Sequence, residues 1–482
     1  MSCLSEKLAE REVAGRVIQV GVIGAGKFGS MFIAQAHTTP GIHLAAVCDL
    51  DLSIAREALR RTNYPAHLTD TTGTLSLSDG IASRKTILTT SAADMIAHPS
   101  LDVVLECTGI PSAGVAHTLL CCEHKKHIVM INVEADVLAG PLLARRAREA
   151  GIVYSMAYGD QPALISELVD WARTSGFRVV CAGKGNKYLP EYNYSTPETV
   201  WDHWGFSAEQ LAKDKLNSQI YNSFLDGTKS ALEMAAVANG CGLAVAREGL
   251  TFRPCGYQDL AACLKPRSRG GGGEEMAYVE VVSSLERDGR DVWNHARHGV
   301  FVVIEATSEY QKEAFAQYGM ETDKTGWFAA QYKPWHLIGL EVGVSIANIM
   351  CRGEPTGSTK TFAGDVVATA KKNLVAGEML DGEGGHTVVG KLMPAEVSLE
   401  IEGLPIGLAH GLKLKRDVKK DQGLSWADVE FSEDSQVVKV RREMEAIFRE
   451  EFAKKAKGIK PPNGVLVARA DGNVTNGVNG HH

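Results

Sequence analysis

A glycine-rich turn between a strand and a helix constrains the fold of this chain more than any other feature. Gly24-Ala25-Gly26-Lys27-Phe28-Gly29 directly follows the apolar run from Val17 to Ile23 and opens a helical stretch from Lys27 to Thr38. A second apolar run, from His43 to Cys48, ends at Asp49, about 20 residues past the last glycine. This spacing is typical of a βαβ unit that binds a dinucleotide.

The residues of this turn have separate expected roles. Gly24 permits the tight turn, Gly26 lets the backbone approach a pyrophosphate, and Gly29 allows close packing of the helix on the strand. Lys27 and Phe28 begin the helix, whose free N–H groups and partial positive charge attract phosphate. An accidental glycine loop in another kind of α/β unit is the alternative interpretation.

Composition and charge exclude several classes of protein. The net charge of -7 and the lack of a basic stripe argue against a general nucleic-acid binder. The polar stretch 1–15 lacks the apolar core of a signal peptide, and no apolar run reaches the roughly 18 residues that a membrane helix needs. The ten cysteines form no C-x-x-C pair, which suits a reducing compartment. We therefore expect a cytoplasmic protein that binds no membrane.

The order of predicted elements indicates an α/β protein with a Rossmann domain over residues 1–183. This region alternates strands and helices, which predicts a doubly wound, mostly parallel sheet. The later strands of the sheet are expected at Asp102–Cys107, His127–Ile131 and Ile152–Met156, and one of its helices at Val137–Gly151. The polar stretch 69–85 is expected to be an irregular insertion.

Beyond the Rossmann domain, the pattern predicts two further parts and a tail. Residues 184–356 are expected to form an α+β domain for catalysis and dimerisation, and residues 357–457 a small all-β module followed by a helix at Val437–Lys455. The Gly- and Asn-rich tail, residues 458–482, is predicted to be disordered. The loop 265–273 is expected to be a mobile surface connection or a lid whose arginines meet an anionic substrate.

Side chains at the ends of three predicted strands are candidates to hold the cofactor. Asp49 can accept hydrogen bonds from the adenosine ribose, which favours NAD because a 2′-phosphate would face its negative charge. Arg56, on the next helix, can compensate, so NADP stays open. Cys107-Thr108-Gly109 and Asn132-Val133-Glu134 end two other strands at the same sheet edge, within reach of the nicotinamide half. A helix-capping loop is the alternative for the segment of Asn132 and Glu134.

A helix that begins near Asp226 carries the candidate catalytic pair. Asp226 is a suitable N-cap, and Lys229 lies on the same face three residues later. A cation at a helix N-terminus is electrostatically unfavourable, which predicts a partner or a task for Lys229. Its ammonium group can donate a proton to a carbonyl oxygen as hydride arrives at the carbon, while Asp226 positions it.

A second cationic group is predicted to hold the substrate. Lys184 and Lys187 flank Asn186 just after the strand expected at Phe177–Gly183. Two ammonium groups and an amide at a sheet edge favour a phosphate or carboxylate ligand, with a solvated loop as the alternative. The histidines show no metal-ligand spacing, so no metal site is predicted, and a metal requirement stays open.

These motifs resemble those of the homoserine dehydrogenase-like oxidoreductases. The likeness lies in Gly24-Ala25-Gly26 with Gly29, in the strand end Leu105–Gly109, and in the helix start at Asp226 and Lys229. In that family a helix lysine with a nearby aspartate serves the reacting carbonyl, so the resemblance implies this role for Lys229 and Asp226. The chain departs from the family's usual Asn-Gly-Thr-Thr and Asn-Lys, and carries Gly185–Tyr188 and Asn132–Glu134 instead.

A closer resemblance, over nearly the whole chain, is to the subgroup with a C-terminal SAF domain. The motifs that carry it are Gly183–Lys187, Asp226–Ser230, Tyr332–Glu341 and Gly377–Gly385. The subgroup includes the 1-deoxy-D-xylulose 5-phosphate reductoisomerase-like enzymes, which reduce that sugar phosphate with NADPH after a skeletal rearrangement. The resemblance implies NADPH as cofactor and a C-terminal SAF module. We also expect a homodimer or a higher homo-oligomer.

The expected function is NAD(P)-dependent oxidation or reduction of a small polar carbonyl or hydroxy compound. We expect the substrate to be phosphorylated, with its anionic end held by Lys184, Asn186 and Lys187. A homoserine- or hydroxy-acid-type dehydrogenase is one alternative. A protein that binds NAD(P)H as a sensor or interaction module, without turnover, is another.

Overall fold

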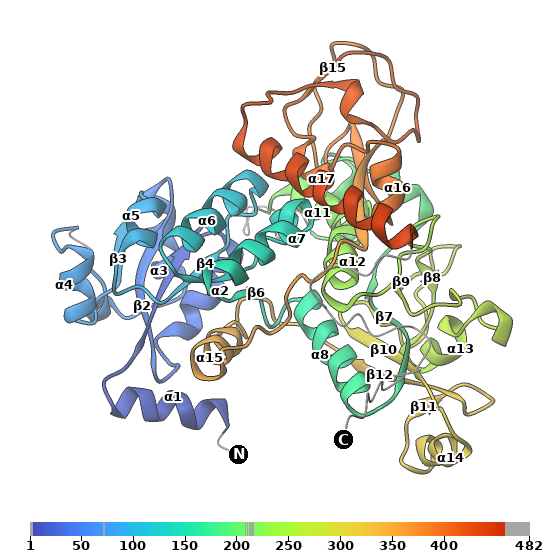
Figure 1. Ribbon diagram of the computed structural model, residues 1–482, viewed down its shortest axis with the longest axis horizontal. Coiled ribbons are helices and arrows are strands. Elements are labelled where there is room, and N and C mark those ends of the chain that lie inside the picture. Colours follow the sequence, from blue (N-terminus) through green and yellow to red (C-terminus); the bar gives the residue numbers. More distant parts are fainter. Residues whose placement is uncertain (1–2, 71–72, 208, 210, 212–215, 458–482) are drawn as a thin grey trace, which may run out of the picture.

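The structure is a computed structural model of the chain, and it describes residues 3–70, 73–207, 209, 211 and 216–457. An N-terminal α/β part lies beside a part built on a mixed sheet, and a C-terminal part lies above the second (Figure 1). The predicted disordered tail, residues 458–482, lies outside the described residues.

The N-terminal sheet is parallel and has the strand order β3-β2-β1-β4-β5-β6. Its strands are β1 (Ile18–Ile23), β2 (Ile42–Cys48), β3 (Ile87–Thr89), β4 (Val103–Glu106), β5 (His127–Met130) and β6 (Tyr154–Met156). Its helices are α1 (Leu4–Val13), α2 (Lys27–Ala36), α3 (Leu52–Arg61), α4 (Leu77–Ala82), α5 (Ala92–Ala97), α6 (Pro111–Glu123) and α7 (Val133–Ala150). Every residue of β2 is buried, as in a parallel sheet with both faces covered. The predicted Rossmann-like α/β sheet is confirmed.

Two helices differ from the expected pattern because of their caps. α4 lies within residues 69–85, where an irregular insertion was predicted, and Ser76 caps it by accepting the N–H of Asp79. α7 begins at Val133 rather than at Val137, because the side chain of Asn132 accepts the N–H of Ala135.

The second sheet is mixed and has the strand order β11-β12-β10-β7-β9-β8. Its strands are β7 (Arg178–Asn186), β8 (Arg253–Pro254), β9 (Tyr278–Ser283), β10 (Val300–Glu305), β11 (Glu321–Thr322) and β12 (Phe328–Lys333). β7 pairs with β10 in the antiparallel and with β9 in the parallel direction. The domain boundary expected at residue 183 therefore falls inside a strand of the second sheet.

The helices of this part include one that lies where several elements meet. They are α8 (Gln161–Thr174), α9 (Val200–Trp204), α11 (Ser218–Leu225), α12 (Thr228–Cys241), α13 (Leu260–Leu264) and α14 (Glu309–Gln317). α12 contacts α7, α8 and strands of both the second sheet and the C-terminal part. Every residue of α12 except Lys229 is buried. The helix therefore fixes Lys229 at a junction of all three parts.

After the second sheet the chain returns to the N-terminal part. α15 (Gly343–Arg352) places Ile346 and Ile349 in the same hydrophobic core as Ile18 and Phe32 (Figure 1). The guanidinium of Arg11 also donates to the carbonyl oxygen of Met350 at 2.7 Å. This helix lies within the range expected for the second domain, yet it packs on the first.

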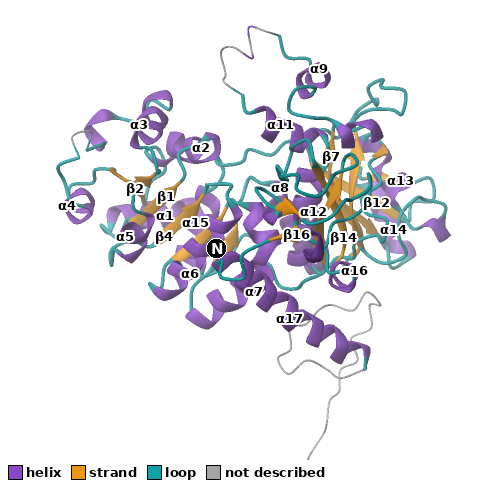
Figure 2. Cartoon of the chain, turned by 90° about the horizontal axis from the view of Figure 1, so that it is seen from above, coloured by secondary structure: helices purple, strands orange, loops and turns teal. Residues whose placement is uncertain are grey.

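The C-terminal part combines short strands with two helices. β13 (Gly364–Ala370) pairs with β14 (Val388–Pro394), and β15 (Lys413–Leu414) pairs with β16 (Val429–Glu430), both in the antiparallel direction. α16 (Ala395–Glu400) was not expected, whereas α17 (Gln436–Ala456) matches the predicted amphipathic helix. Seen from above, α17 lies beside α7 (Figure 2). Buried Arg441 of α17 bonds Asp365 of β13 and, at 3.1 Å, the carbonyl oxygen of Leu138 in α7.

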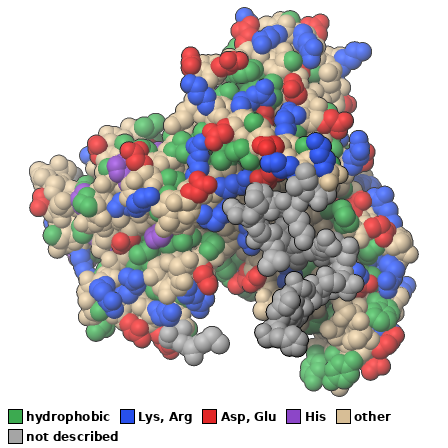
Figure 3. Space-filling view, in the orientation of Figure 1, with side chains coloured by type: hydrophobic (Ala, Val, Ile, Leu, Met, Phe, Trp, Pro, Cys, Tyr) green, Lys and Arg blue, Asp and Glu red, His purple; other side chains and the backbone are tan. Residues whose placement is uncertain are grey.

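The surface carries charges of both signs. Acidic and basic side chains are mixed over the face shown in Figure 3, and hydrophobic side chains gather near α14. Tyr310 and Tyr318, at either end of that helix, are 83% and 84% exposed. Within the described ranges, no helix has the length and apolar character needed to cross a bilayer.

Candidate active site

The glycine turn has the geometry of a phosphate cradle. Gly24 has a φ of +93°, and a Cβ there would lie 2.9 Å from the backbone of Cys107. A Cβ on Gly29 would lie 2.1 Å from the carbonyl oxygen of Gly24, whereas a Cβ on Gly26 would meet nothing within 4 Å. No side chain caps the first turn of α2. Open space beside these free N–H groups fits a pyrophosphate.

A carboxylate and a guanidinium group border this cradle. Asp49 Oδ2 accepts the N–H of Ala25 at 2.9 Å. Arg61 donates to the carbonyl oxygens of Ala25 and Gly26 at 2.8 and 2.9 Å. The arginine that contacts the turn is therefore Arg61 and not Arg56, which the sequence brought forward.

The candidates after β4 and β5 are connected with each other. Thr108 Oγ1 donates to the buried carboxylate of Glu106 at 2.5 Å and lies 3.3 Å from Asn132 Nδ2. Asn132 also donates to the carbonyl oxygen of Ile110 at 2.9 Å and caps α7. The capping interpretation therefore describes Asn132. Cys107 is buried, and Gly109, which has a φ of +67°, would carry a Cβ into open space.

Lys229 lies at the junction of the Rossmann domain and the second part. Its Nζ contacts a carboxylate oxygen of Glu134, in the first turn of α7. Both side chains keep some access to solvent, 13% for Lys229 and 11% for Glu134. The partner predicted for a cation at a helix N-terminus is therefore a carboxylate from the other domain.

Three further carboxyl groups act on Lys229. They are Asp160 before α8, Glu233 one turn along α12, and Glu383 of the C-terminal part. Burial lowers the pKa of Lys229, but the carboxylates, Glu134 foremost, raise it above its ordinary value. Burial and then Glu233 raise the pKa of Asp160 to about 7, and burial and then Glu134 raise the pKa of Glu383 to about 8. The site thus joins an ammonium group that is protonated at rest to carboxyl groups that exchange protons near neutral pH.

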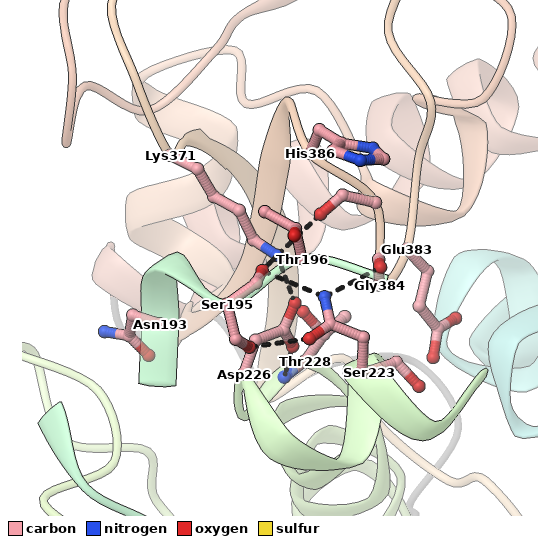
Figure 4. A network of polar contacts seen from close by, with 12 residues as sticks. Asn193, Ser195, Thr196, Ser223, Asp226, Thr228, Lys371, Glu383, Gly384 and His386 are labelled. Carbon is pink, nitrogen blue, oxygen red and sulfur yellow. Dashed lines mark hydrogen bonds and ion pairs between the residues drawn. The ribbon is translucent and has the colours of Figure 1, made fainter. Parts of the chain in front are cut away.

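The loop that carries Glu383 is fixed on α11. Gln219 donates to the carbonyl oxygen of Glu383, and Asn222 to that of Gly384, both at 2.8 Å. Gly384 has a φ of +67°, and a Cβ there would lie 2.0 Å from the carbonyl oxygen of Gln219. The side chain of Glu383 points away from Lys371 (Figure 4).

Asp226 has a different partner from Lys229 (Figure 4). Its Oδ2 accepts from Lys371 Nζ at 2.7 Å, and its Oδ1 accepts the N–H of Thr228 at 2.9 Å. The N-cap of α12 is Gly227, with a φ of +89°, so Asp226 satisfies a first-turn amide from one residue earlier. The buried Asp226–Lys371 pair fastens the C-terminal part to the start of α12. The carboxylate of Asp226 therefore bonds Lys371 and Thr228 and forms no hydrogen bond or ion pair with Lys229.

The residues expected to hold the substrate point in different directions. Lys184 pairs with Glu233, and their side chains are only 6% and 3% exposed. Asn186 donates to the carbonyl oxygen of Phe224 at 3.0 Å. Lys187, beyond the end of β7, donates to the carbonyl oxygen of His203. Lys184 is therefore satisfied internally, and Lys187 is directed elsewhere.

Several site residues were missed by the sequence reasoning, namely Asp160, Glu233, His336 and Glu383. One ring nitrogen of His336 lies 2.8 Å from the carbonyl oxygen of His298, and the other lies 3.1 Å from Gln161 Nε2. His336 and Glu383 lie within the motifs 332–341 and 377–385, so that resemblance contained a signal for them. Asp160 and Glu233 are single carboxylates in helical sequence and gave no such signal.

The arginine-rich loop is tied down by its own neighbours. Arg267 and Arg269 form ion pairs with Glu274 and Glu305, each at 3.2 Å. These pairs favour a surface connection over a lid. Across the described residues, no group of three or more His, Cys, Asp or Glu side chains is arranged to hold a metal ion.

Two protein families match successive parts of the chain. Residues 18–131 match an oxidoreductase family with an NAD-binding Rossmann fold, and residues 159–342 match the catalytic domain of oxidoreductase DRL. The second match includes Asp160, Lys229 and His336. A comparison with curated proteins found no match.

Solved structures are similar at low identity. An oxidoreductase from Klebsiella pneumoniae is 14% identical, over 71% of this chain and 88% of that chain, with a TM-score of 0.36. 1-Deoxy-D-xylulose 5-phosphate reductoisomerase from Zymomonas mobilis, in complex with NADPH, is 19% identical over 46% and 57%, with a TM-score of 0.30. Myo-inositol dehydrogenase from Lactobacillus casei, in complex with NAD(H) and myo-inositol, is 20% identical over 39% and 50%, with a TM-score of 0.27. The chain thus spans about half the length of the last two proteins.

The two family matches are both to oxidoreductases, and the first is to a nucleotide-binding domain. The chain is therefore an NAD(P)-dependent oxidoreductase with a Rossmann domain and a DRL-type catalytic domain.

Proposed function

We propose that this oxidoreductase interconverts a carbonyl and a hydroxyl group on a small phosphorylated substrate, with Lys229 as the proton donor. The observation that carries the proposal is the partly exposed side chain of Lys229, whose ammonium group is held against Glu134 where the Rossmann part meets the second part. The reaction we put first is of the 1-deoxy-D-xylulose 5-phosphate reductoisomerase type. The DRL family match and the sequence resemblance support it.

The proposed chemistry assigns each side chain one task. A nicotinamide cofactor, when bound, supplies the hydride, with its pyrophosphate at Gly24, Gly26 and Gly29. Lys229 binds the substrate's carbonyl oxygen and gives it a proton, and Glu134 orients the ammonium group. Glu134 thus takes the positioning role that was expected of Asp226. Asp160 and Glu383, whose pKa values are raised to about 7 and about 8, can return a proton to Lys229.

We propose NADPH as the preferred nucleotide. Asp49 is already engaged by the N–H of Ala25, which reduces its availability to a ribose hydroxyl. Exposed Arg61 borders the same turn and can pair with a 2′-phosphate. Fluorescence titration should show tighter binding of NADPH than of NADH. Arg61→Met should remove most of that difference and leave NADH binding unchanged.

A turnover screen tests the function. Purified full-length protein is assayed for NADPH oxidation with 1-deoxy-D-xylulose 5-phosphate, and for NAD(P)⁺ reduction with homoserine and a panel of hydroxy acids and sugar phosphates. Gly26→Val is the matched control, because a branched side chain fills the cradle without touching the core. Turnover only with unphosphorylated hydroxy acids favours the dehydrogenase alternative. Tight NADPH binding without any turnover favours the sensor alternative.

Three further assignments belong to the same proposal. Residues 357–457 form a SAF module, the protein is a homodimer or larger homo-oligomer, and it works in the cytoplasm. The ten cysteines, all free, support a reducing compartment. Light scattering of the full-length protein measures its oligomeric state.

A further inference from the structure

Arg297 has a charge that no ion pair among the described residues balances. Its guanidinium group is partly buried, yet within the described part of the chain it forms no ion pair or hydrogen bond. It stacks on the indole of Trp204, 5.1 Å from the ring centroid. Exposed Asp291 is the carboxylate that acts on it, from beyond ion-pair distance. Partly desolvated guanidinium groups normally have an anionic partner.

Lys187 brings a second positive charge to the same place. It donates to the carbonyl oxygen of His203, the residue before Trp204. The loop of Arg297 runs against β7, because a Cβ on Gly185 would lie 2.8 Å from the backbone nitrogen of Arg297. Burial and then Arg297 lower the pKa of Lys187, and Asp291 opposes them in part. Two cations from separate segments thus meet the consecutive residues His203 and Trp204.

A third donor at this place also lacks an acceptor. The indole N–H of Trp204 is enclosed, and none of the described residues accepts its hydrogen bond. An enclosed donor without an acceptor is unfavourable, and so are two adjacent cations whose nearby carboxylate, Asp291, lies beyond ion-pair distance of both. A ligand with negative charge and several acceptor oxygens would satisfy the guanidinium group, the ammonium group and the indole N–H together.

We propose that Arg297, Lys187 and Trp204 form a subsite for the phosphate group of the substrate. A phosphate dianion offers the planar guanidinium two parallel hydrogen bonds and leaves oxygens for the ammonium and indole groups. This assignment rests on the proposed function in one respect, the phosphorylated substrate. It also replaces Lys184, which Glu233 already neutralises.

A chain of contacts joins this subsite to the proposed reaction centre. His298 follows Arg297, and its carbonyl oxygen lies 2.8 Å from a ring nitrogen of His336. The other ring nitrogen lies 3.1 Å from Gln161, the neighbour of Asp160. In the opposite direction, Trp204 packs against Tyr221, whose ring centroid lies 5.9 Å from Lys27 Nζ in the cofactor cradle. A phosphate of the cofactor is therefore the competing source of the anion.

Calorimetric titration with inorganic phosphate tests the subsite without any need for turnover. The full-length protein is titrated in phosphate- and sulfate-free buffer, with and without saturating NADPH. We expect the wild type to bind phosphate in both conditions. Arg297→Met and Lys187→Met should each weaken binding by about 10- to 150-fold. Trp204→Phe, which keeps the stacked ring, should weaken it by a few-fold. Arg290→Met is the control, since Arg290 lies on the same loop but is exposed and paired with Asp288.

Three results would overturn the proposal. They are no phosphate binding by the wild type, equal affinity in Arg297→Met, or displacement of phosphate by NADPH, which would assign the anion site to the cofactor. If Arg297→Met does not fold, as judged by circular dichroism, Lys187→Met and Trp204→Phe decide the question. The proposed function can fail separately, because loss of the Lys229 role would leave phosphate binding unchanged.

Discussion

Lys229 and Arg297 are both cations, but the side chains around them differ in charge. Lys229 contacts Glu134 and is acted on by three further carboxyl groups. Arg297 instead contacts an aromatic ring, and its charged neighbours are Lys187 and, beyond ion-pair distance, Asp291. Excess carboxylate around an ammonium group keeps it protonated and supplies groups that return a proton. A cation that forms no ion pair instead keeps its binding capacity for a ligand. The groups around a cation, more than its residue type, therefore decide whether it transfers a proton or binds an anion.

The largest effect should follow from removing the cation of the carboxylate-rich centre. Lys229→Met should lower turnover by about 10²- to 10⁴-fold, the scale of general acid catalysis, and leave the affinity for NADPH nearly unchanged. Steady-state kinetics and fluorescence titration on the same preparation measure both quantities. Turnover within a few-fold of the wild type would make Lys229 a structural residue.

The two lysines near the end of β7 should differ strongly in their effect on stability. Lys184→Met leaves the buried carboxylate of Glu233 without its partner and should cost about 3–5 kcal/mol in the free energy of unfolding. Lys187→Met relieves repulsion from Arg297 and should change it by less than about 1 kcal/mol. Urea unfolding measures both. The double variant Lys184→Met/Glu233→Gln should recover much of the loss, and an unrecovered loss would assign it to packing.

The two centres should also give opposite dependences of stability on pH. The pKa of Asp160 is raised to about 7 by burial and then Glu233, so between about pH 4 and pH 7 the folded protein binds more protons than the unfolded chain. Stability should therefore fall as pH rises through this window, by about 2 kcal/mol between pH 5 and pH 7, and Asp160→Asn should abolish this component. The lowered pKa of Lys187 should make stability rise with pH in the alkaline range. Urea unfolding across pH 5 to about 10.5 checks both slopes, because the window of Lys187 ends at the ordinary lysine pKa. An unchanged slope in Asp160→Asn would contradict the first.

The smallest effect is expected at the indole of Trp204. Trp204→Phe removes an enclosed N–H that has no acceptor among the described residues, so in phosphate-free buffer stability should change by less than about 0.5 kcal/mol. Thermal unfolding measures the change. A loss of more than about 1 kcal/mol would mean that the indole contributes to the folded state through its N–H or its packing, so that its N–H is not held free for a ligand.

The Rossmann part was predictable because its signals are local. The glycine spacing and the alternation of strands and helices follow from backbone sterics and burial within short segments. Asn132 shows the limit of that reasoning, because both of its roles were foreseen and the capping role was found.

The partners of the site residues were not predictable, because they join distant parts of the chain. Lys229 meets Glu134 across 95 residues, and Asp226 meets Lys371 across 145. The sequence around α12 indicates that Lys229 needs a partner but not which residue supplies it. Arg297 lies in no recognised sequence motif. Its proposed role follows from the absence of an ion pair or hydrogen bond to its guanidinium group among the described residues.

The register of β7 in the second sheet decides where two lysine side chains lie. Lys184 and Lys187 lie on this one strand and its end, yet Lys184 pairs with Glu233 of α12 and Lys187 donates to a carbonyl oxygen of α9. A slip of one residue would exchange the faces of the sheet that these side chains address. Gly183 and Gly185 oppose such a slip, because only glycine fits at these two positions of the strand. A Cβ on Gly183 would lie 1.8 Å from the carbonyl oxygen of Glu280, and a Cβ on Gly185 would lie 1.9 Å from that of Ala296. A single-residue insertion or deletion in this strand would therefore damage the surroundings of both Lys229 and Arg297, although neither residue itself would be changed.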